Sequence, residues 1–145
     1  MYGGSMKRKA SAVWNGGLKE GRGTLSSASG VLNSMPYSFA TRFEDKPGTN
    51  PEELIAAAHA GCFSMALSAI LGESGVTPES ISTTATVTIE KQGDGFAITE
   101  SHLEVRAKVP GLQEAKFMEA AGKAEEGCPV SKVLNAKITM DAKLI

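Results

Sequence analysis

Almost no net charge remains in this sequence of 145 residues, because 15 basic side chains stand against 16 acidic ones. A chain without a basic excess has no general electrostatic attraction for nucleic acid or for an anionic membrane surface. Long apolar runs are also missing, since His59, Ser64 and Ser68 interrupt the longest one before it reaches the length of a membrane span. We therefore expect neither nucleic acid nor a membrane as a partner.

Cysteine is almost absent, with only Cys62 and Cys128 in the chain. We recognise no secretory signal, and two cysteines without one favour a reducing compartment, which we expect to be the cytoplasm. In such a compartment a pair of cysteines is more often redox-active or catalytic than structural. The two thiols are therefore the first candidates for chemistry.

The length of the chain suits one domain with a real core and is short for two. Residues 1–5, followed by a second methionine at Met6, resemble a remnant of cloning, so we expect a single domain over residues 6–145. Strands, a long helix, a hairpin, two helices and a last strand follow one another, which indicates an α+β fold. The expected strands cover 7–14, 18–26, 81–91, 96–109 and 136–145, the shorter helices 112–126 and 128–134, and an edge strand or extended loop 31–43.

The longest predicted element is a helix within the stretch from Thr49 to Gly75. Asn50 and Glu53 can close a capping box at its start, and Pro51 suits the first helical position. The sequence that follows is apolar or small on almost every face, which is typical of a buried helix. Because so long a helix exceeds what one small domain can cover, we expect a partner chain to bury part of it.

The predicted hairpin after this helix contains a change of parity. In its second strand Ile98 has an even number, whereas the later apolar residues Leu103 and Val105 have odd ones. Since neighbouring residues of a strand point to opposite faces, we expect a β-bulge between Thr99 and His102.

The two thiols differ in their local surroundings. Cys128 precedes Pro129 and is expected to cap a short helix, where backbone N–H groups and the helix dipole favour its thiolate. Cys62 lies in the middle of the apolar helix, where a free cysteine is commonly just a small buried apolar side chain. A reactive Cys62 therefore needs a cation or hydrogen-bond donors from elsewhere.

Arg42 is the natural cation, since it lies between apolar neighbours shortly before the helix; the alternative is a solvated arginine at a strand end. Glu52 precedes Cys62 by ten positions, which separates the two by about 15 Å along one straight helix. They can share a site only if the helix pairs antiparallel with the same helix of a second subunit. Otherwise Glu52 is a carboxylate that stabilises the start of the helix.

His59 lies three residues before Cys62 and shares a helix face with it. A Cys–His pair suggests thiol hydrolase chemistry, whereas a lone helical histidine beside small residues is more often simply packed. The spacing of His59, Cys62, His102 and Cys128 matches no zinc-binding pattern, so we expect no metal.

Two runs of sequence carry a resemblance to a known family. The first covers residues 36–44 and 48–67 and includes Thr-Arg-Phe-Glu and His59-Ala-Gly-Cys62; the second is Gly127-Cys128-Pro129-Val130-Ser131. Both resemble the OsmC/Ohr family of osmotically inducible and organic hydroperoxide resistance proteins. The resemblance covers essentially residues 6–145. The Thr-Arg-Phe-Glu run and the position of His59 before the first cysteine are similar to those of the OsmC branch.

The resemblance implies a thiol-dependent peroxidase that prefers organic hydroperoxides to hydrogen peroxide and needs no metal or organic cofactor. It also implies an intertwined homodimer, with antiparallel sheets around a long buried central helix and two active sites at the interface. In the family, the residues that match Cys62 and Cys128 are the peroxidatic and resolving cysteines, and those that match Arg42 and Glu52 activate the first thiol. This reverses the local ranking of the two thiols, and we expect a guanidinium in a dry site to outweigh a dipole effect of about 1 kcal/mol.

The implied cycle passes through a Cys62 sulfenic acid and a Cys62–Cys128 disulfide. An external thiol then reduces the disulfide; it is a lipoyl protein, thioredoxin or a small dithiol. Two other functions remain as alternatives: a thiol hydrolase that uses Cys62 and His59, and a non-catalytic binder of apolar ligands. An apolar wall for the alkyl part of the substrate is expected from Phe39, Phe43, Ile55 and Met65.

Overall fold

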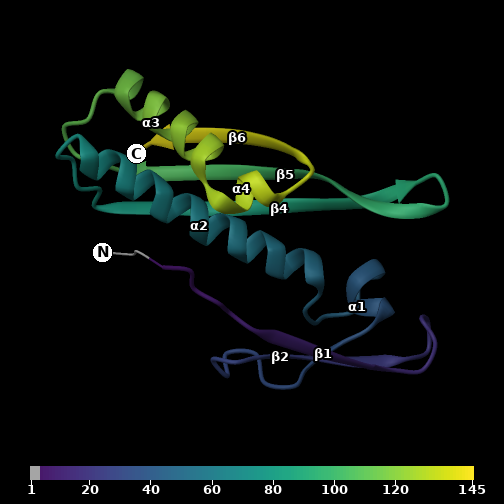
Figure 1. Cartoon of the computed structure of the whole chain (residues 1–145). Helices are drawn as coiled ribbons and strands as arrows, with labels where there is room; N and C mark the ends of the chain where they lie inside the picture. The colour runs from purple at the N-terminus through teal and green to yellow at the C-terminus, as the bar shows by residue number, and fades with distance from the viewer. Residues whose placement is uncertain (1–3) are drawn as a thin grey trace. The chain divides into compact units, whose positions relative to one another are not determined.

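The computed structural model of this protein describes residues 4–145, so the predicted cloning remnant over residues 1–5 lies largely outside the described residues. The chain forms two compact units, of which the first ends at Pro51 and the second covers Glu52–Ile145 (Figure 1). Each unit contains its own three-stranded sheet. The single domain expected over residues 6–145 stays a prediction.

The first unit is an antiparallel sheet followed by a short helix. β1 (Ala10–Asn15) pairs with β2 (Arg22–Ser27), β2 pairs with β3 (Met35–Tyr37), and α1 (Phe39–Phe43) comes next. The chain reverses after β1 at Asn15-Gly16-Gly17, a sequence typical of hairpin turns, and Gly16 adopts a positive φ of 94° there. The connection runs from Gly16 to Gly21 and is longer than a two-residue turn.

Residues 31–43, predicted as an edge strand or an extended loop, contain β3 and a helix that the prediction missed. The Ser38 hydroxyl accepts a hydrogen bond from the Thr41 N–H at 3.3 Å, and the Thr41 hydroxyl accepts one from the Ser38 N–H at 2.9 Å. This reciprocal capping box starts α1. The signal was a serine and a threonine three residues apart, but Pro36 favoured an extended interpretation of the whole segment.

Two aromatic rings close over a glycine in this sheet. Trp14, Gly23 and Tyr37 lie opposite one another on β1, β2 and β3. The ring centroids are 5.4 Å apart, and a Cβ on Gly23 would come within 2.5 Å of an atom of each ring. Only glycine therefore fits at position 23 with both rings in place.

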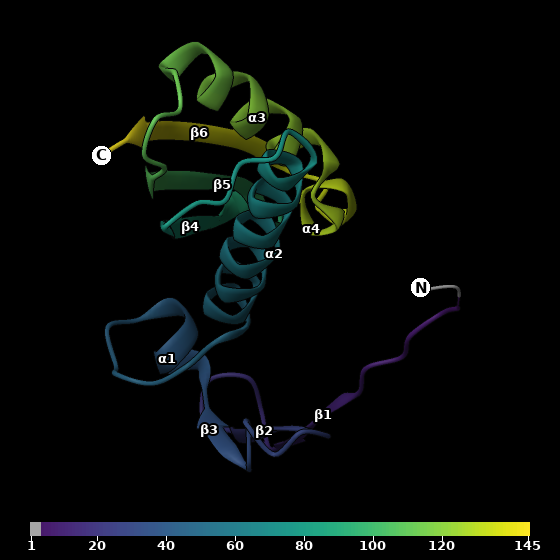
Figure 2. The ribbon, with the colours of Figure 1, turned by 90° about the vertical axis from the view of Figure 1, so that its left-hand side faces the viewer.

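The second unit combines a long helix, a sheet and two shorter helices. α2 (Pro51–Glu73) begins at the residue that the sequence predicted. The remaining elements are β4 (Ser80–Gln92), β5 (Gly95–Lys108), α3 (Glu114–Gly127), α4 (Pro129–Val133) and β6 (Lys137–Leu144). α3 and α4 connect β5 to β6, and α4 lies beside α2 (Figure 2).

The sheet of the second unit is mixed, with β5 in the middle. β4 and β5 form the predicted antiparallel hairpin, but β5 and β6 run parallel. The expectation of antiparallel sheets is therefore wrong for this pair. The helices between β5 and β6 carry the chain back to the end of the sheet where β5 began, so that β6 runs in the same direction.

β5 contains the bulge that the change of parity predicted. Thr99 is the extra residue, since its neighbours Ile98 and Glu100 pair with adjacent residues of β4. The bulge was expected between Thr99 and His102, and it lies at the first residue of that range. Its effect is to turn Ser101 to the buried face of β5.

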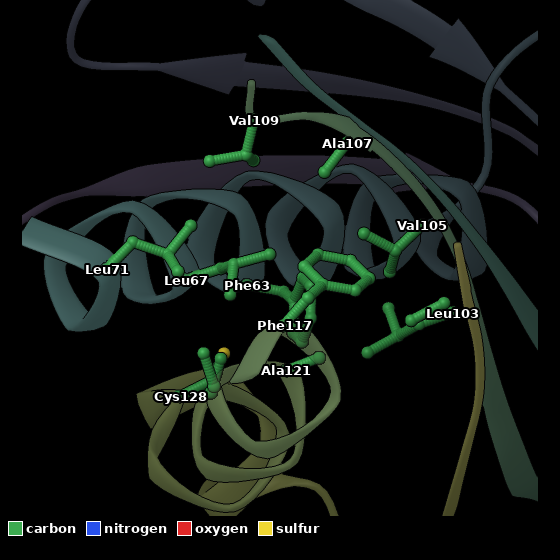
Figure 3. Packing of buried hydrophobic residues seen from close by; sticks show 13 residues of the cluster. Phe63, Leu67, Leu71, Leu103, Val105, Ala107, Val109, Phe117, Ala121 and Cys128 are labelled. Atoms are coloured by element: carbon green, nitrogen blue, oxygen red, sulfur yellow. The ribbon is translucent and has the colours of Figure 1, made fainter. Parts of the chain in front are cut away.

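The core of the second unit is built from α2, β5 and α3 (Figure 3). α2 buries one stripe of side chains and leaves other apolar surface uncovered within the chain; Met65, for example, is 77% exposed. By length and composition α2 could also cross a membrane, with a mean hydropathy of 1.8, but core helices pass the same test. The buried stripe recurs every fourth residue: His59, Phe63, Leu67 and Leu71.

Candidate functional site

The two thiols of the chain are free and lie in contact. Cys62 comes from α2 and Cys128 from the junction of α3 and α4, and their sulfurs are 2.8 Å apart. Cys128 is completely buried and Cys62 is half-buried, so the pair is reached from the Cys62 side. The two sulfurs thus lie within reach of the disulfide that the resemblance implies, while the chemical roles of the two cysteines stay predictions.

Cys128 lies at the junction of α3 and α4 and belongs to the same buried core cluster as Ala121 of α3 (Figure 3). α3 ends at Gly127, and Cys128 adopts φ −59° and ψ 123°, the non-helical backbone expected before Pro129. Its N–H still donates to the Ala124 carbonyl at 2.9 Å, while its own carbonyl accepts from the Lys132 N–H of α4 at 3.1 Å. Cys128 therefore ends one helix and caps the next, and both hold its backbone in place.

The surroundings shift the two thiols in opposite directions. Burial raises the pKa of the Cys62 thiol, the hydrogen bond with Cys128 raises it further, and the Val130 N–H offsets this only in part. Burial also opposes ionisation of Cys128, but donors at Cys62, Ser131 and Val130 outweigh it and lower the pKa of Cys128. The backbone N–H groups of Ser131 and Val130 contribute to this lower pKa, although the Cys128 side chain accepts no capping hydrogen bond at the start of α4. Within this unit Cys128 is thus the thiol that ionises more readily.

The proton between the two sulfurs follows this order of ionisation. With both thiols protonated, the Cys128 S–H donates to the Cys62 sulfur. Once Cys128 ionises, the Cys62 S–H becomes the donor and stabilises the Cys128 thiolate. A Cys62 thiolate therefore needs a further stabilising group, for which the sequence suggests Arg42.

The first unit holds Arg42 in an aromatic setting. The Arg42 guanidinium lies over the Phe43 ring, 5.0 Å from its centroid, and the Phe39 and Phe43 rings are 5.1 Å apart. These three predicted site residues line one cavity of about 230 Å³. Its other walls are Trp14, Leu18, Tyr37 and Ser38.

The remaining predicted residues share α2 with Cys62. Glu52 lies in the first turn of α2 and is only 6% exposed, Ile55 is half-buried, and Met65 is largely exposed. Because α2 is one continuous helix, the ten positions between Glu52 and Cys62 correspond to about 15 Å. Glu52 and Cys62 of one chain therefore do not meet, so a site that contains both residues requires a second subunit.

His59 is engaged with serines rather than with Cys62. It is completely buried, its Nδ1 lies 2.6 Å from the Ser101 hydroxyl, and its Nε2 lies 2.8 Å from the Ser131 hydroxyl. Burial lowers the pKa of His59, which favours the neutral ring. Both ring nitrogens are thereby occupied, so the geometry disfavours the alternative of a Cys62–His59 hydrolase pair.

Ser101 and Ser131 are the polar residues that the sequence interpretation missed. Ser131 stood in the second cysteine motif, three residues after Cys128, where one helical turn returns a side chain to the same face. Ser101 could be found only through the bulge, which sets the face of β5 on which it lies. Among residues 4–145, no group of three or more His, Cys, Asp or Glu side chains is placed to hold a metal ion.

Known proteins resemble this chain over most of its length. The family described as OsmC-like protein matches residues 43–143. Peroxiredoxin OsmC of Escherichia coli strain K12 is 55% identical over 140 residues, which cover 97% of this chain and 98% of the relative. The organic hydroperoxide resistance protein of Xanthomonas axonopodis pv. citri strain 306 is 34% identical over 98 residues, or 67% of each chain.

A solved structure shares the fold. The crystal structure of OhrB, the organic hydroperoxide resistance protein of Bacillus subtilis, superposes with a TM-score of 0.68 at 27% identity and covers 93% of this chain and 98% of that one. The predicted OsmC/Ohr-like α+β fold, with two sheets and a central helix, is thereby confirmed. From the family match and the 55% identity it follows that this chain belongs to the OsmC branch of the OsmC/Ohr family.

Proposed function

We propose that this protein is a thiol-dependent peroxidase that reduces organic hydroperoxides to alcohols. The observation that carries the proposal is the contact between two free thiols, 2.8 Å apart, of which one is buried and one half-buried. The relatives named peroxiredoxin and organic hydroperoxide resistance protein support a peroxidase-type function. Two thiols can take up and pass on the two electrons of the reaction by forming a disulfide.

In the first step, the Cys62 thiolate attacks the outer oxygen of the hydroperoxide. The O–O bond breaks, an S–O bond forms, and the alkoxide takes up a proton and leaves as the alcohol, which converts Cys62 to a sulfenic acid. Cys62 is the proposed nucleophile because it is the more exposed residue of the two. Arg42 stabilises the thiolate and the developing alkoxide, and Glu52 orients Arg42.

In the second step, Cys128 attacks the sulfur of the Cys62 sulfenic acid. An S–S bond forms, the S–O bond breaks, and the hydroxide takes up a proton and leaves as water. A reducing dithiol then restores both thiols by disulfide exchange and is itself oxidised to a disulfide. The proposed reductants are a lipoyl protein, thioredoxin or a small dithiol, and the proposed compartment is the cytoplasm, where such thiols are kept reduced.

The substrate preference follows from the aromatic cavity. Phe39 and Phe43 offer apolar surface beside the Arg42 guanidinium, and Ile55 and Met65 of α2 are proposed to extend this wall. An alkyl group gains free energy from leaving water for such a surface, at roughly 25 cal/mol per Å² of apolar area. Hydrogen peroxide has no alkyl group to bury, so organic hydroperoxides are expected to react faster.

The decisive experiment measures consumption of an organic hydroperoxide in the presence of a dithiol. Wild-type protein is expected to turn over many equivalents, and Cys62→Ser to consume none above the uncatalysed rate. A thioester substrate tested in parallel distinguishes the hydrolase alternative, which would release acid without consuming peroxide. A wild-type protein that left the hydroperoxide intact under these conditions would contradict the proposed function.

The role of Cys128 has its own test by mass spectrometry. After one equivalent of organic hydroperoxide without dithiol, the wild-type chain is expected to lose two hydrogens as the disulfide forms. Cys128→Ser is expected instead to gain one oxygen as a sulfenic acid, because no second thiol is present to condense with it. A stable sulfenic acid in the wild-type chain would remove Cys128 from the mechanism.

A further inference from the structure

The two cysteines that touch each other differ in their access to solvent. Cys128 is 0% exposed and is a member of the buried cluster that also contains Phe117, Ala121 and Ala124 of α3 (Figure 3). Cys62 is only half-buried. Within the second unit, a molecule that arrives from solvent therefore meets Cys62 before it can meet Cys128.

Formation of the proposed disulfide would leave this difference in place. The sulfurs are 2.8 Å apart and need to approach by only about 0.8 Å to reach the length of an S–S bond. The Cys128 backbone is held on both sides, by hydrogen bonds of 2.9 Å to the Ala124 carbonyl and of 3.1 Å from the Lys132 N–H. The hydrogen bond of 2.8 Å between His59 and Ser131 also ties α4 to α2. We therefore expect Cys128 to stay in the core when it is oxidised.

The direction of attack makes this burial important for reduction of the disulfide. In thiol–disulfide exchange the attacking thiolate approaches one sulfur from the side opposite the sulfur that leaves, so its rate depends on access to the attacked sulfur. No part of Cys128 is accessible, and an attack on its sulfur would first require the core to open. Attack on Cys62 needs no such opening of the core.

We propose that the reductant attacks the Cys62 sulfur of the disulfide and that Cys128 is the leaving group, so that the mixed disulfide joins the reductant to Cys62 alone. The place of this step in a peroxidase cycle rests on the proposed function, whereas the difference in access between the two cysteines does not.

The exchange balances in two steps. The first thiolate of the dithiol forms an S–S bond with Cys62, the bond between Cys62 and Cys128 breaks, and its electron pair stays on Cys128, which takes up a proton. The second thiolate of the dithiol then attacks the dithiol sulfur of the mixed disulfide, so that Cys62 leaves and takes up a proton. The dithiol is thereby oxidised to a disulfide, and both cysteines are reduced.

The ionisation of the two thiols supports the same assignment. A sulfur with a lower pKa is the better leaving group in thiol–disulfide exchange. Burial raises the pKa of Cys62, whereas the pKa of Cys128 is lowered despite its burial. Access and leaving-group character therefore favour the same direction of attack.

The first test compares access in two single-cysteine chains, Cys128→Ser and Cys62→Ser, by their reaction with an aromatic disulfide that releases a coloured thiol. Cys62 in the first chain is expected to react at least about tenfold faster than Cys128 in the second, because Cys128 must wait for the core to open. Ease of ionisation predicts the opposite order, so the two causes are distinguished. The matched control repeats the reaction in denaturant, where the two rates should become similar.

A folded Cys62→Ser chain that reacts at least as fast as the Cys128→Ser chain would overturn the proposal. This comparison uses no hydroperoxide. The proposal can therefore fail while the peroxidase function holds, and the peroxidase function can fail while the order of access holds.

The second test uses the wild-type chain, so it does not depend on the folding of a variant. The disulfide is formed with diamide and treated with cysteamine, a small monothiol that cannot release itself from a mixed disulfide. The reaction is stopped in acid, free thiols are blocked with N-ethylmaleimide, and trypsin cleavage after Lys123 and Lys132 places Cys128 in a different peptide from Cys62.

Mass spectrometry of these peptides identifies the attacked sulfur. Cysteamine is expected on the Cys62 peptide and the maleimide on the Cys128 peptide. Cysteamine on the Cys128 peptide in an equal or greater amount would overturn the proposal.

Discussion

At the scale of single residues, the site depends on which thiol is ionised. Within the second unit, burial raises the pKa of Cys62, while hydrogen-bond donors lower the pKa of Cys128. The more accessible cysteine is thus the one whose thiol is harder to ionise. A peroxidase that uses Cys62 must correct this imbalance with positive charge, and Arg42 is the residue proposed to supply it.

Arg42→Ala is expected to raise the pKa of the Cys62 thiol and to slow the reaction with hydroperoxide by at least about tenfold, because a neighbouring cation typically shifts a pKa by 1–3 units. Since only the thiolate reacts, the lost rate should return as the pH is raised. Arg42→Lys should recover part of it, because a single ammonium group replaces the charge but not the fork of donors. The test is the pH profile of the rate; an alanine variant with the wild-type profile would show that another group lowers the pKa.

His59 gives stability a dependence on pH. Its pKa in the folded protein lies below the ordinary 6.5, so below that pH the unfolded chain binds a proton that the folded chain does not. The free energy of unfolding should therefore fall as the pH falls below 6.5, by at most about 1.4 kcal/mol per pH unit. Denaturant unfolding of wild type and His59→Gln at several pH values measures the pH dependence that comes from His59, which the variant should lack. Parallel curves for the two proteins would contradict the prediction.

At the scale of elements, the sheet of the first unit supports the aromatic cavity. Trp14 and Tyr37 line this cavity together with Arg42, and their rings meet over Gly23 of β2. The helix α1, which carries Arg42, starts from the capping box of Ser38 and Thr41. The position of Arg42 therefore depends on local hydrogen bonds and on close ring packing within its own unit.

Gly23→Ala is expected to lower the free energy of unfolding by about 1–3 kcal/mol, because the added methyl group would force both rings to move. The matched control is Gly122→Ala in α3, where a Cβ meets nothing within 4 Å and alanine should stabilise the helix by up to about 1 kcal/mol. Chemical denaturation compares the two variants with wild type. Equal stability of Gly23→Ala and wild type would mean that the rings separate without cost.

At the scale of the whole molecule, two features of α2 remain unexplained by a single chain. Its buried stripe leaves apolar side chains such as Met65 exposed. Its straight run also keeps Glu52 about 15 Å from Cys62, although the proposed mechanism uses both. An antiparallel pairing of α2 with its copy across a two-fold axis would cover the exposed surface and bring Glu52 of one chain to Cys62 of the other. We therefore propose a homodimer with composite sites.

Subunit mixing tests this arrangement. Glu52→Ala and Cys62→Ser chains are each expected to be inactive alone, but a mixed dimer pairs the intact Glu52 of one chain with the intact Cys62 of the other at one of its two sites. After refolding together, random pairing should restore about one quarter of the wild-type activity per chain. A mixture that stays inactive, although mixed dimers are shown to form, would place both residues within one chain's site.

The sequence by itself determined the α+β class, the long central helix and the two cysteine motifs. These features follow from local information: periodic apolar residues, caps, turns, and residue types at fixed spacing along the chain. The same local information ranked Cys128 above Cys62 in ease of ionisation, and the structure keeps this order within the second unit. The bulge in β5 was also visible, because a change of parity is a property of one strand.

Only the tertiary structure decided the parallel pairing of β5 with β6, the contact between the two sulfurs, and the engagement of His59. Each depends on which segments meet after a crossover, and the spacing of Cys62 and Cys128 along the chain contains no such information. The missed helix α1 shows the limit at short range, where Pro36 and a capping box supported opposite predictions. His59 shows the limit at long range. Its neighbour along the helix is Cys62, but in the folded chain both of its ring nitrogens form hydrogen bonds with serines from other elements.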